Sequence, residues 1–328
     1  IALAGDSVYV NTSSLRYRTS AQIKDNNIAG NLSYGQKLER VGTSGQWTMI
    51  LLNGKKYYVS SAYVTSKKPA SAGAVQTTSQ TAAGAQTSGG TAIALSSNYK
   101  YANYSKINSG TATLYRSTAS NKKNKVVCVN AGHGTNGGGS VKTQCHPDGS
   151  AKVTGGTTGA GATSAVAVSS GMTFADGTAE SKVTLAMAKV LKTKLLNAGY
   201  DVLMLRESDD VQLDNIARTV IANNNADCHI ALHWDSTSSN KGAFFMSVPS
   251  NATYRAMEPV ASHWKQHNQL GESLISGLKS AGVKIYSKGS MEMDLTQTSY
   301  STIPSVDIEL GDKASDHSGA TLETLANG

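Results

Sequence analysis

Hydrophobic residues follow two different patterns along the chain, and the change comes near residue 125. Before this point, short runs alternate apolar and polar positions between turn residues, which is typical of half-buried strands. The clearest of these runs are residues 7–10, 38–41, 46–51 and 56–59. The dipeptide Asn53-Gly54 between the last two runs predicts a tight hairpin. About sixty residues of this kind predict a small all-β barrel.

From Lys125 onward, strand-like and helix-like segments alternate. A helical stripe of apolar residues covers residues 179–198 and ends at Gly199. Helices are also predicted over residues 213–223 and 259–281, and strands over 112–116, 200–205, 228–233, 243–248 and 306–310. A further buried strand is predicted from Lys125 to the histidine at position 133. The alternation predicts an α/β fold with a twisted, largely parallel sheet flanked by helices.

The two patterns are separated by a stretch with no charged residue between Lys68 and Lys100. Ala, Thr, Ser, Gly and Gln dominate this stretch, and its apolar residues show no periodicity. Such a composition predicts a flexible linker over residues 69–100. We therefore expect one domain over residues 1–68 and a second over 101–328. The linker would give reach, so that one domain stays bound to a surface while the other domain searches for bonds nearby.

Composition favours a secreted protein. Only 16% of the 328 residues are charged, and small polar residues take their place. No apolar run approaches the length of about 18 residues that a membrane helix needs, so no transmembrane segment is expected. The chain opens at Ile1 without a basic and apolar leader, so any signal peptide has been removed.

The net charge of +8 is concentrated near the N-terminus. Residues 1–68 hold nine Lys or Arg residues against three Asp or Glu residues, a balance of +6. This balance favours an anionic polymer or surface as partner. No helix-turn-helix, zinc-finger or aromatic RNA-binding motif accompanies the charge, so nucleic acid is not expected. An anionic cell wall suits the composition better.

Several motifs in the sequence do not indicate a functional site. Gly132-x-Gly134-x-x-Gly137 follows a predicted strand, but it opens no helix and lacks the acidic residue that holds a ribose. No GxSxG motif is present for a serine hydrolase. His263 and His267 share a predicted helix face, which we expect to be packed or solvated. The three cysteines, Cys128, Cys145 and Cys228, form no CxxC pair; Cys128 and Cys228 are expected to be buried thiols, with a disulfide between them left open.

Four other residues form a candidate catalytic site. His133, His233 and Glu309 lie at or near the ends of predicted strands, and Glu180 opens a predicted helix. In α/β sheets, functional groups gather beyond the carboxyl ends of the strands. Catalytic zinc takes three protein ligands from His and Glu and keeps one position for water, while a further carboxylate serves as base. The set therefore predicts a zinc hydrolase site.

The N-terminal motifs resemble a known domain family. Residues 14–19, 35–38, 45–47 and 58–64 are, in this order, similar to the motifs of the bacterial SH3-like domain. The resemblance covers nearly all of residues 1–68 and implies a small barrel that attaches wall hydrolases to peptidoglycan. The alternative is that the tyrosines of this segment only complete its core.

The second half resembles the N-acetylmuramoyl-L-alanine amidases of the family-3 type. Residues 127–134, Glu180, residues 226–236 and residues 303–311 match its four motifs in order. The resemblance covers about residues 125–312 and implies a secreted Zn²⁺ enzyme that cleaves the amide bond between N-acetylmuramic acid and L-alanine in peptidoglycan.

The resemblance also implies roles for single residues. His133, Glu180 and His233 would hold the zinc, and Glu309 would take a proton from the attacking water and pass it to the leaving amine. Two alternatives stay open: a catalytically inactive wall-binding protein, and a wall carboxypeptidase or endopeptidase that uses the same zinc site.

The chain departs from the family pattern at three places. A Gly- and Thr-rich insertion, residues 134–179, separates His133 from Glu180; it is expected to rim the cleft, where it selects substrate, covers the zinc or is a tolerated surface excursion. Asp307 replaces a usually apolar residue and faces the same side of its strand as Glu309. Asp235 stands where the family often has asparagine. Both aspartates are candidates for contacting the substrate or supporting the zinc ligands.

Overall fold

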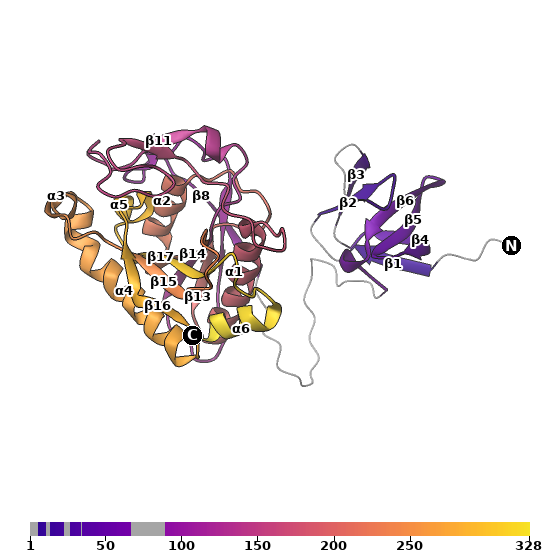
Figure 1. Cartoon of the computed structure of the whole chain (residues 1–328). Helices are drawn as coiled ribbons and strands as arrows, with labels where there is room; N and C mark the ends of the chain where they lie inside the picture. Colours follow the sequence, from indigo (N-terminus) through magenta and orange to yellow (C-terminus); the bar gives the residue numbers. More distant parts are fainter. Residues whose placement is uncertain (1–5, 11–13, 23–26, 34, 67–88) are drawn as a thin grey trace. The chain divides into compact units, whose positions relative to one another are not determined.

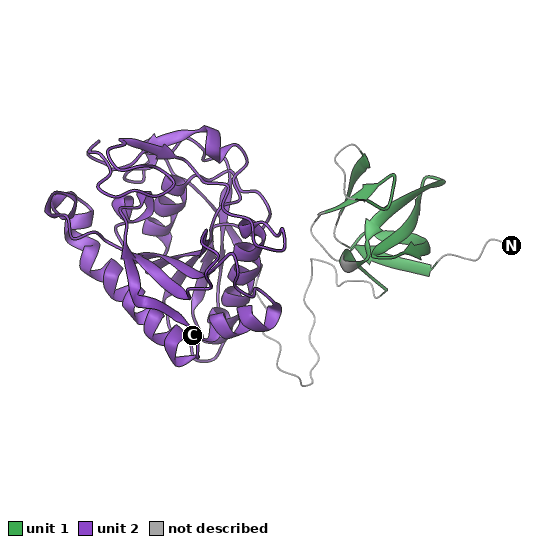
Figure 2. Ribbon diagram, in the orientation of Figure 1, with its two compact units in different colours: residues 1–82 green, residues 83–328 purple. Residues whose placement is uncertain are grey.

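The structure is a computed structural model that describes residues 6–10, 14–22, 27–33, 35–66 and 89–328. The chain divides into two compact units, residues 1–82 (unit 1) and residues 83–328 (unit 2), shown in Figure 2. Each unit has its own hydrophobic core. Residues 69–88 of the predicted linker lie outside the described residues.

Unit 1 is an antiparallel sheet with strand order β3-β2-β6-β5-β4-β1-β7. Its strands are β1 (Asp6–Val10), β2 (Ser14–Arg18), β3 (Ile28–Ser33), β4 (Lys37–Ser44), β5 (Trp47–Leu52), β6 (Lys55–Ser60) and β7 (Val64–Thr65). The four runs predicted as strands are confirmed as parts of β1, β4, β5 and β6. Inward-facing aliphatic residues such as Val10 and Ile50 are fully buried. The resemblance to an SH3-like barrel stays a prediction.

The predicted hairpin joins β5 and β6. Leu52 pairs with Lys55, which leaves Asn53 and Gly54 as a two-residue turn. Both turn residues have positive φ, 50° and 76°. This is the backbone that a type I′ hairpin turn requires and that Asn-Gly adopts readily.

Unit 2 is built on an eight-stranded sheet with order β16-β15-β17-β14-β10-β13-β9-β8 (Figure 1). The strands are β8 (Thr91–Ala94), β9 (Thr111–Tyr115), β10 (Val126–Ala131), β13 (Asp201–Met204), β14 (Cys228–Asp235), β15 (Ala243–Ser247), β16 (Ile285–Glu292) and β17 (Ser305–Asp312). The central strands β13, β10, β14 and β17 are parallel to one another. Beside them, β9 is antiparallel to β13 and β15 is antiparallel to β17. The α/β prediction is confirmed, but the sheet is mixed, because β9 and β15 run antiparallel to the central strands and β8 pairs antiparallel with β9, to which it is joined without a crossover α-helix.

Helices cover both faces of this sheet (Figure 1). They are α1 (Glu180–Asn197), α2 (Asn215–Asn225), α3 (Ala252–Ala256), α4 (Val260–Ser280), α5 (Thr296–Tyr300) and α6 (Gly319–Asn327). Val127 and Val129 of β10 share a core with α1, α4 and α6, whereas Cys128 between them packs with α2. Successive strand residues face opposite sides, so the run is apolar throughout. Every described helix is too short or too polar to span a bilayer.

The structure corrects or completes three expectations. The predicted linker over residues 69–100 is wrong at residues 91–94, because Thr91–Ala94 form β8, in which Ile93 pairs with Ala112 and packs on the α2 side of the core. The three cysteines are free thiols; Cys128 and Cys145 are buried, whereas Cys228, which was also expected to be buried, is partly exposed. His263 and His267 bond to backbone groups, the carbonyl of Pro259 and the amide of Ser305.

Candidate metal centre

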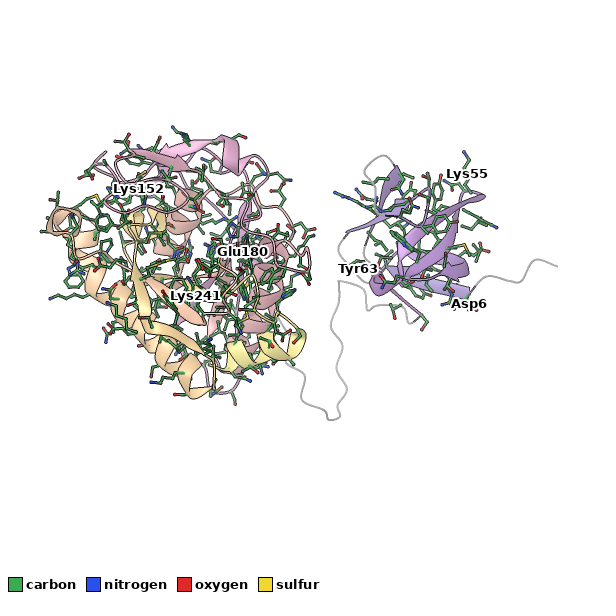
Figure 3. The ribbon with its side chains drawn as sticks, viewed as in Figure 1. Asp6, Lys55, Tyr63, Lys152, Glu180 and Lys241 are labelled. Carbon is green, nitrogen blue, oxygen red and sulfur yellow. The ribbon has the colours of Figure 1, made fainter. Side chains whose placement is uncertain are left out.

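The three predicted ligands meet in the interior of unit 2, where Figure 3 labels Glu180. His133 follows β10, Glu180 is the first residue of α1, and His233 lies in β14. His133 Nε2 lies 2.8 Å from Glu180 Oε1. His233 Nδ1 lies 3.0 Å from His133 Nε2 and 3.2 Å from Glu180 Oε1. The structure thus brings together side chains that are up to one hundred residues apart in sequence.

His133 is presented by a backbone in the left-handed region, with φ of 65°. Such a conformation is uncommon for a residue other than glycine and needs support from its surroundings. Arg218 of α2 supplies it: Nη2 donates to the His133 carbonyl at 2.7 Å, and Nη1 donates to the Ala131 carbonyl at 3.1 Å. The guanidinium is buried, and its hydrogen bonds hold the backbone of the loop that carries His133.

A second buried guanidinium ties the same loop to α1. Arg206 Nη2 donates to the carbonyls of Gly132 and Ser181, each at 2.9 Å. Gly132 precedes one predicted ligand and Ser181 follows the other, so Arg206 fixes the distance between His133 and Glu180. Neither arginine was predicted as part of the site, because nothing in the sequence distinguishes them from surface arginines.

The end of the insertion supports the same ligands. The carbonyl of Ser169 accepts a hydrogen bond from His133 Nδ1 at 2.8 Å. The Met172 amide donates to Glu180 Oε2 at 2.8 Å, and the Trp234 amide donates to Glu180 Oε1 at 3.0 Å. The end of the insertion therefore contacts two of the three predicted ligands.

Charges in the cluster are strongly coupled. Burial opposes ionisation of Glu180, but hydrogen bonds from His133 and His233 outweigh it and hold the pKa of this carboxyl well below its usual range. Burial likewise opposes a charged His233, but the carboxylates of Asp307 and Glu180 raise its pKa to about 10. Two ring nitrogens and a carboxylate oxygen lie within 4.8 Å of one another. This donor set fits a divalent cation such as Zn²⁺, which would take the place of the protons the cluster shares.

Two carboxylates of β17 lie beside the cluster. Glu309 pairs in register with His233, and Asp307 lies two residues earlier on the same face. Glu309 Oε2 and Asp307 Oδ1 are buried and have no hydrogen-bond partner among the described residues. Burial and the neighbouring Asp307 raise the pKa of Glu309 well above its usual range. Glu309 and Asp307 also line the cleft beside the three predicted ligands.

Asp235 is already engaged by other side chains. Its Oδ2 accepts hydrogen bonds from Lys241 Nζ at 2.7 Å and from Thr237 Oγ1 at 2.6 Å. Lys241, labelled in Figure 3, also lies over the rings of Phe244 and Tyr286. Asp235 lines the cleft, but the structure gives it no contact with the three predicted ligands.

The cluster opens into a cleft of about 440 Å³, within the range of small-ligand sites. Its walls come from the β10 loop, the insertion, the start of α2 and the segment after β16. Residues of the cleft away from the cluster include Gly156, Thr157, Thr158, Ala165, Val166, Met246, Met291, Met293 and Gln297. The insertion contributes a two-stranded sheet, β11 (Lys142–Gln144) with β12 (Ser164–Val166), to this wall.

Asp294 fastens the insertion to the segment that follows β16. Its carboxylate accepts hydrogen bonds from His146 at 3.0 Å, Lys152 at 2.9 Å and the Val153 amide at 2.7 Å, and it also bonds to Thr154. The carboxylate is fully buried. Met293 next to it lines the cleft, as does Lys152, labelled in Figure 3. A single side chain therefore connects two walls that are 140 or more residues apart in sequence.

Gly132 provides a steric test of the site. A Cβ at this position would overlap the imidazole ring of His233. We expect Gly132→Ala to displace that ring and weaken zinc binding about 10- to 100-fold, the equivalent of an overpacking cost of about 1–3 kcal/mol. Zinc affinity measured against a chromophoric chelator checks this. The matched control is Gly139→Ala, where an added Cβ meets nothing within 4 Å; equal affinity in both variants would contradict the geometry.

The chain was also compared with known proteins. Residues 127–326 match the family model described as N-acetylmuramoyl-L-alanine amidase. A search of curated protein sequences found no match.

Solved structures similar to this chain include several amidases. The N-acetylmuramyl-L-alanine amidase Ami1 from Mycobacterium abscessus is 20% identical and has a TM-score of 0.46, with 62% of this chain and 93% of that chain covered. Ami1 from Mycobacterium smegmatis has the same identity and TM-score over 63% and 94%. The amidase AmiC2 of Nostoc punctiforme is 16% identical, with a TM-score of 0.42 over 62% and 92%.

Proposed function

Since the chain belongs to the family of N-acetylmuramoyl-L-alanine amidases, which its residues 127–326 match, we propose that it is a zinc-dependent hydrolase of peptidoglycan. The bond cleaved is the amide between the lactyl group of N-acetylmuramic acid and L-alanine. The observation that carries the proposal is the convergence of His133 Nε2, Glu180 Oε1 and His233 Nδ1 in a cleft that also holds the unpartnered Glu309 Oε2.

In this mechanism His133, Glu180 and His233 would hold the zinc. When bound, the zinc would polarise the scissile carbonyl and lower the pKa of the attacking water. Glu309 accepts a proton from that water as its oxygen attacks the carbonyl carbon. The same carboxyl then donates the proton to the alanine nitrogen as the C–N bond breaks. The products are a free lactyl carboxylate on the glycan and a peptide with a free amino terminus.

Analysis of the products from purified peptidoglycan tests this function. The amidase reaction releases intact stem peptides that begin with L-alanine and leaves glycan strands without peptide. Release of D-alanine would identify a carboxypeptidase instead, and cleavage inside or between peptides an endopeptidase. The absence of any product, with cell-wall binding retained, would identify an inactive wall-binding protein.

Unit 1 serves, in this proposal, as a cell-wall anchor for a secreted, wall-associated enzyme. The supports are the balance of +6 over residues 1–68, the order of motifs that resembles an SH3-like domain, and Tyr63, whose side chain is exposed. A positive net charge of this size attracts an anionic wall polymer, and the attraction weakens as the salt concentration increases.

Deletion of residues 1–68 separates attachment from catalysis. We expect less of the truncated protein to sediment with purified cell walls, since the basic unit is gone. Hydrolysis of a soluble muropeptide should be unchanged, because the metal centre and cleft are built from unit 2 alone. Co-sedimentation and a soluble-substrate assay measure the two effects. Undiminished sedimentation would contradict the anchoring role.

A further inference from the structure

Each side chain of the metal centre has an outer contact on the side away from its neighbours. His133 points Nε2 into the cluster and gives Nδ1 to the Ser169 carbonyl. Glu180 is held by two backbone amides, one on each oxygen. His233 points Nδ1 into the cluster, which leaves Nε2 as the atom that needs an outer partner. In zinc sites, this outer partner fixes the ring orientation and the tautomer of a ligating histidine.

Asp307 is the group that faces His233 Nε2. Its Oδ2 lies 3.5 Å from that nitrogen, an ion-pair distance. The two residues lie on adjacent parallel strands, with Asp307 paired to Ala231 and Glu309 paired to His233. Both side chains are largely buried, with exposures of 17% for His233 and 15% for Asp307.

The carboxylate of Asp307 lowers the stability of the folded protein. Asp307 Oδ1 has no hydrogen-bond partner in the described part of the chain. A buried carboxylate with an unsatisfied oxygen costs stability relative to an apolar side chain of similar size. If residue 307 only filled the core, leucine at this position would give a more stable protein than aspartate.

We propose that Asp307 is a positioning residue that holds His233 with Nε2 protonated and Nδ1 turned toward His133 and Glu180. This inference rests on the proposed function, because it concerns the zinc ligand of that site. Asp307 does not touch the reacting atoms in this role. It acts through His233, as the Ser169 carbonyl acts through His133.

The test uses the full chain, with Asp307→Leu, Asp307→Asn and, as control, Asp227→Asn. Asp227 is also a carboxylate in an ion pair, but it precedes β14 and binds Lys125 at the surface. Zinc affinity is measured by competition with a chromophoric chelator, and thermal unfolding is measured on the metal-free proteins. We expect Asp307→Leu to bind zinc about 10- to 100-fold more weakly while unfolding at a higher temperature. Asp307→Asn should keep most of the affinity, because an amide oxygen at this position can accept a hydrogen bond from Nε2–H. Asp227→Asn should bind zinc like the wild type.

A lower zinc affinity combined with a higher unfolding temperature in Asp307→Leu distinguishes a positioning role from a structural role. Wild-type zinc affinity in Asp307→Leu would overturn the inference while leaving the zinc site intact. A lower unfolding temperature with unchanged affinity would assign Asp307 to the core and overturn it as well. Absence of zinc binding in the wild-type chain would instead overturn the proposed function, and this inference with it.

Discussion

Replacing Glu309 with glutamine is expected to lower kcat by about 10²–10⁴-fold, the range that general acid–base catalysis contributes. Glutamine keeps the size of the side chain but cannot accept the proton of the attacking water. Since Glu309 is not among the three side chains that converge on the metal position, zinc content should be unchanged. Steady-state kinetics on a soluble muropeptide and metal analysis of the same preparation measure both quantities.

The matched control for this substitution is Glu323→Gln. Glu323 lies in α6 and forms a surface ion pair with Lys194, with half of its side chain exposed. This variant should keep wild-type kcat, because Glu323 is neither in the cluster nor among the residues that line the cleft, and its exposed ion pair contributes little to stability. A Glu309→Gln enzyme with near wild-type kcat would show that another group is the base.

Replacing Asp294 with alanine is expected to destabilise unit 2 by about 3–5 kcal/mol, the cost of breaking a buried ion pair from one side. The substitution removes the carboxylate that accepts from buried Lys152 and from the Val153 amide, and it leaves Lys152 with only the backbone carbonyl of residue 294 as acceptor. Denaturant unfolding measures the loss. Asp148→Ala, in the same insertion, is the control: its carboxylate is exposed and bonds mainly to Ser150, so a change within about 0.5 kcal/mol is expected.

The same contact predicts a pH dependence. Burial acts to raise the pKa of Asp294, but hydrogen bonds from His146, Thr154 and Lys152 outweigh it and hold the pKa well below the usual 3.8. A carboxyl whose pKa is lowered by folding stabilises the protein above its unfolded pKa and loses this contribution as the pH falls through the folded value. The difference in unfolding free energy between wild type and Asp294→Ala should therefore shrink as the pH is lowered below about 4. A difference that does not depend on pH would contradict the assignment.

The parts of the fold that could be predicted are those whose signal is local. The apolar run before His133 and the helical stripe after Glu180 each form the expected element, β10 and α1. Strand β16 was missed because Ser287, Lys288 and Gly289 interrupt its apolar alternation. Strand β8 was assigned to a linker because its short Thr- and Ala-rich run becomes a strand only by pairing with β9.

For the site, the side chains could be predicted, but most of the groups that hold them could not. His133, Glu180 and His233 meet because each lies at the end or start of a predicted element. The Ser169 carbonyl and the Met172 amide are backbone groups, and every residue has these, so no sequence pattern marks them. Asp294 could not be linked to the insertion either, since its partners lie some 140 residues away and become neighbours only through the sheet.

Zinc stoichiometry together with zinc-dependent hydrolysis tests the central claim most directly. The purified chain should hold one zinc ion, lose peptidoglycan hydrolysis when a chelator removes the ion, and recover it when zinc is returned. A variant with His133 and His233 both changed to alanine should hold no zinc at this site and stay inactive after zinc is added. Full hydrolysis by that variant, or by wild-type protein shown to be free of metal, would contradict the account.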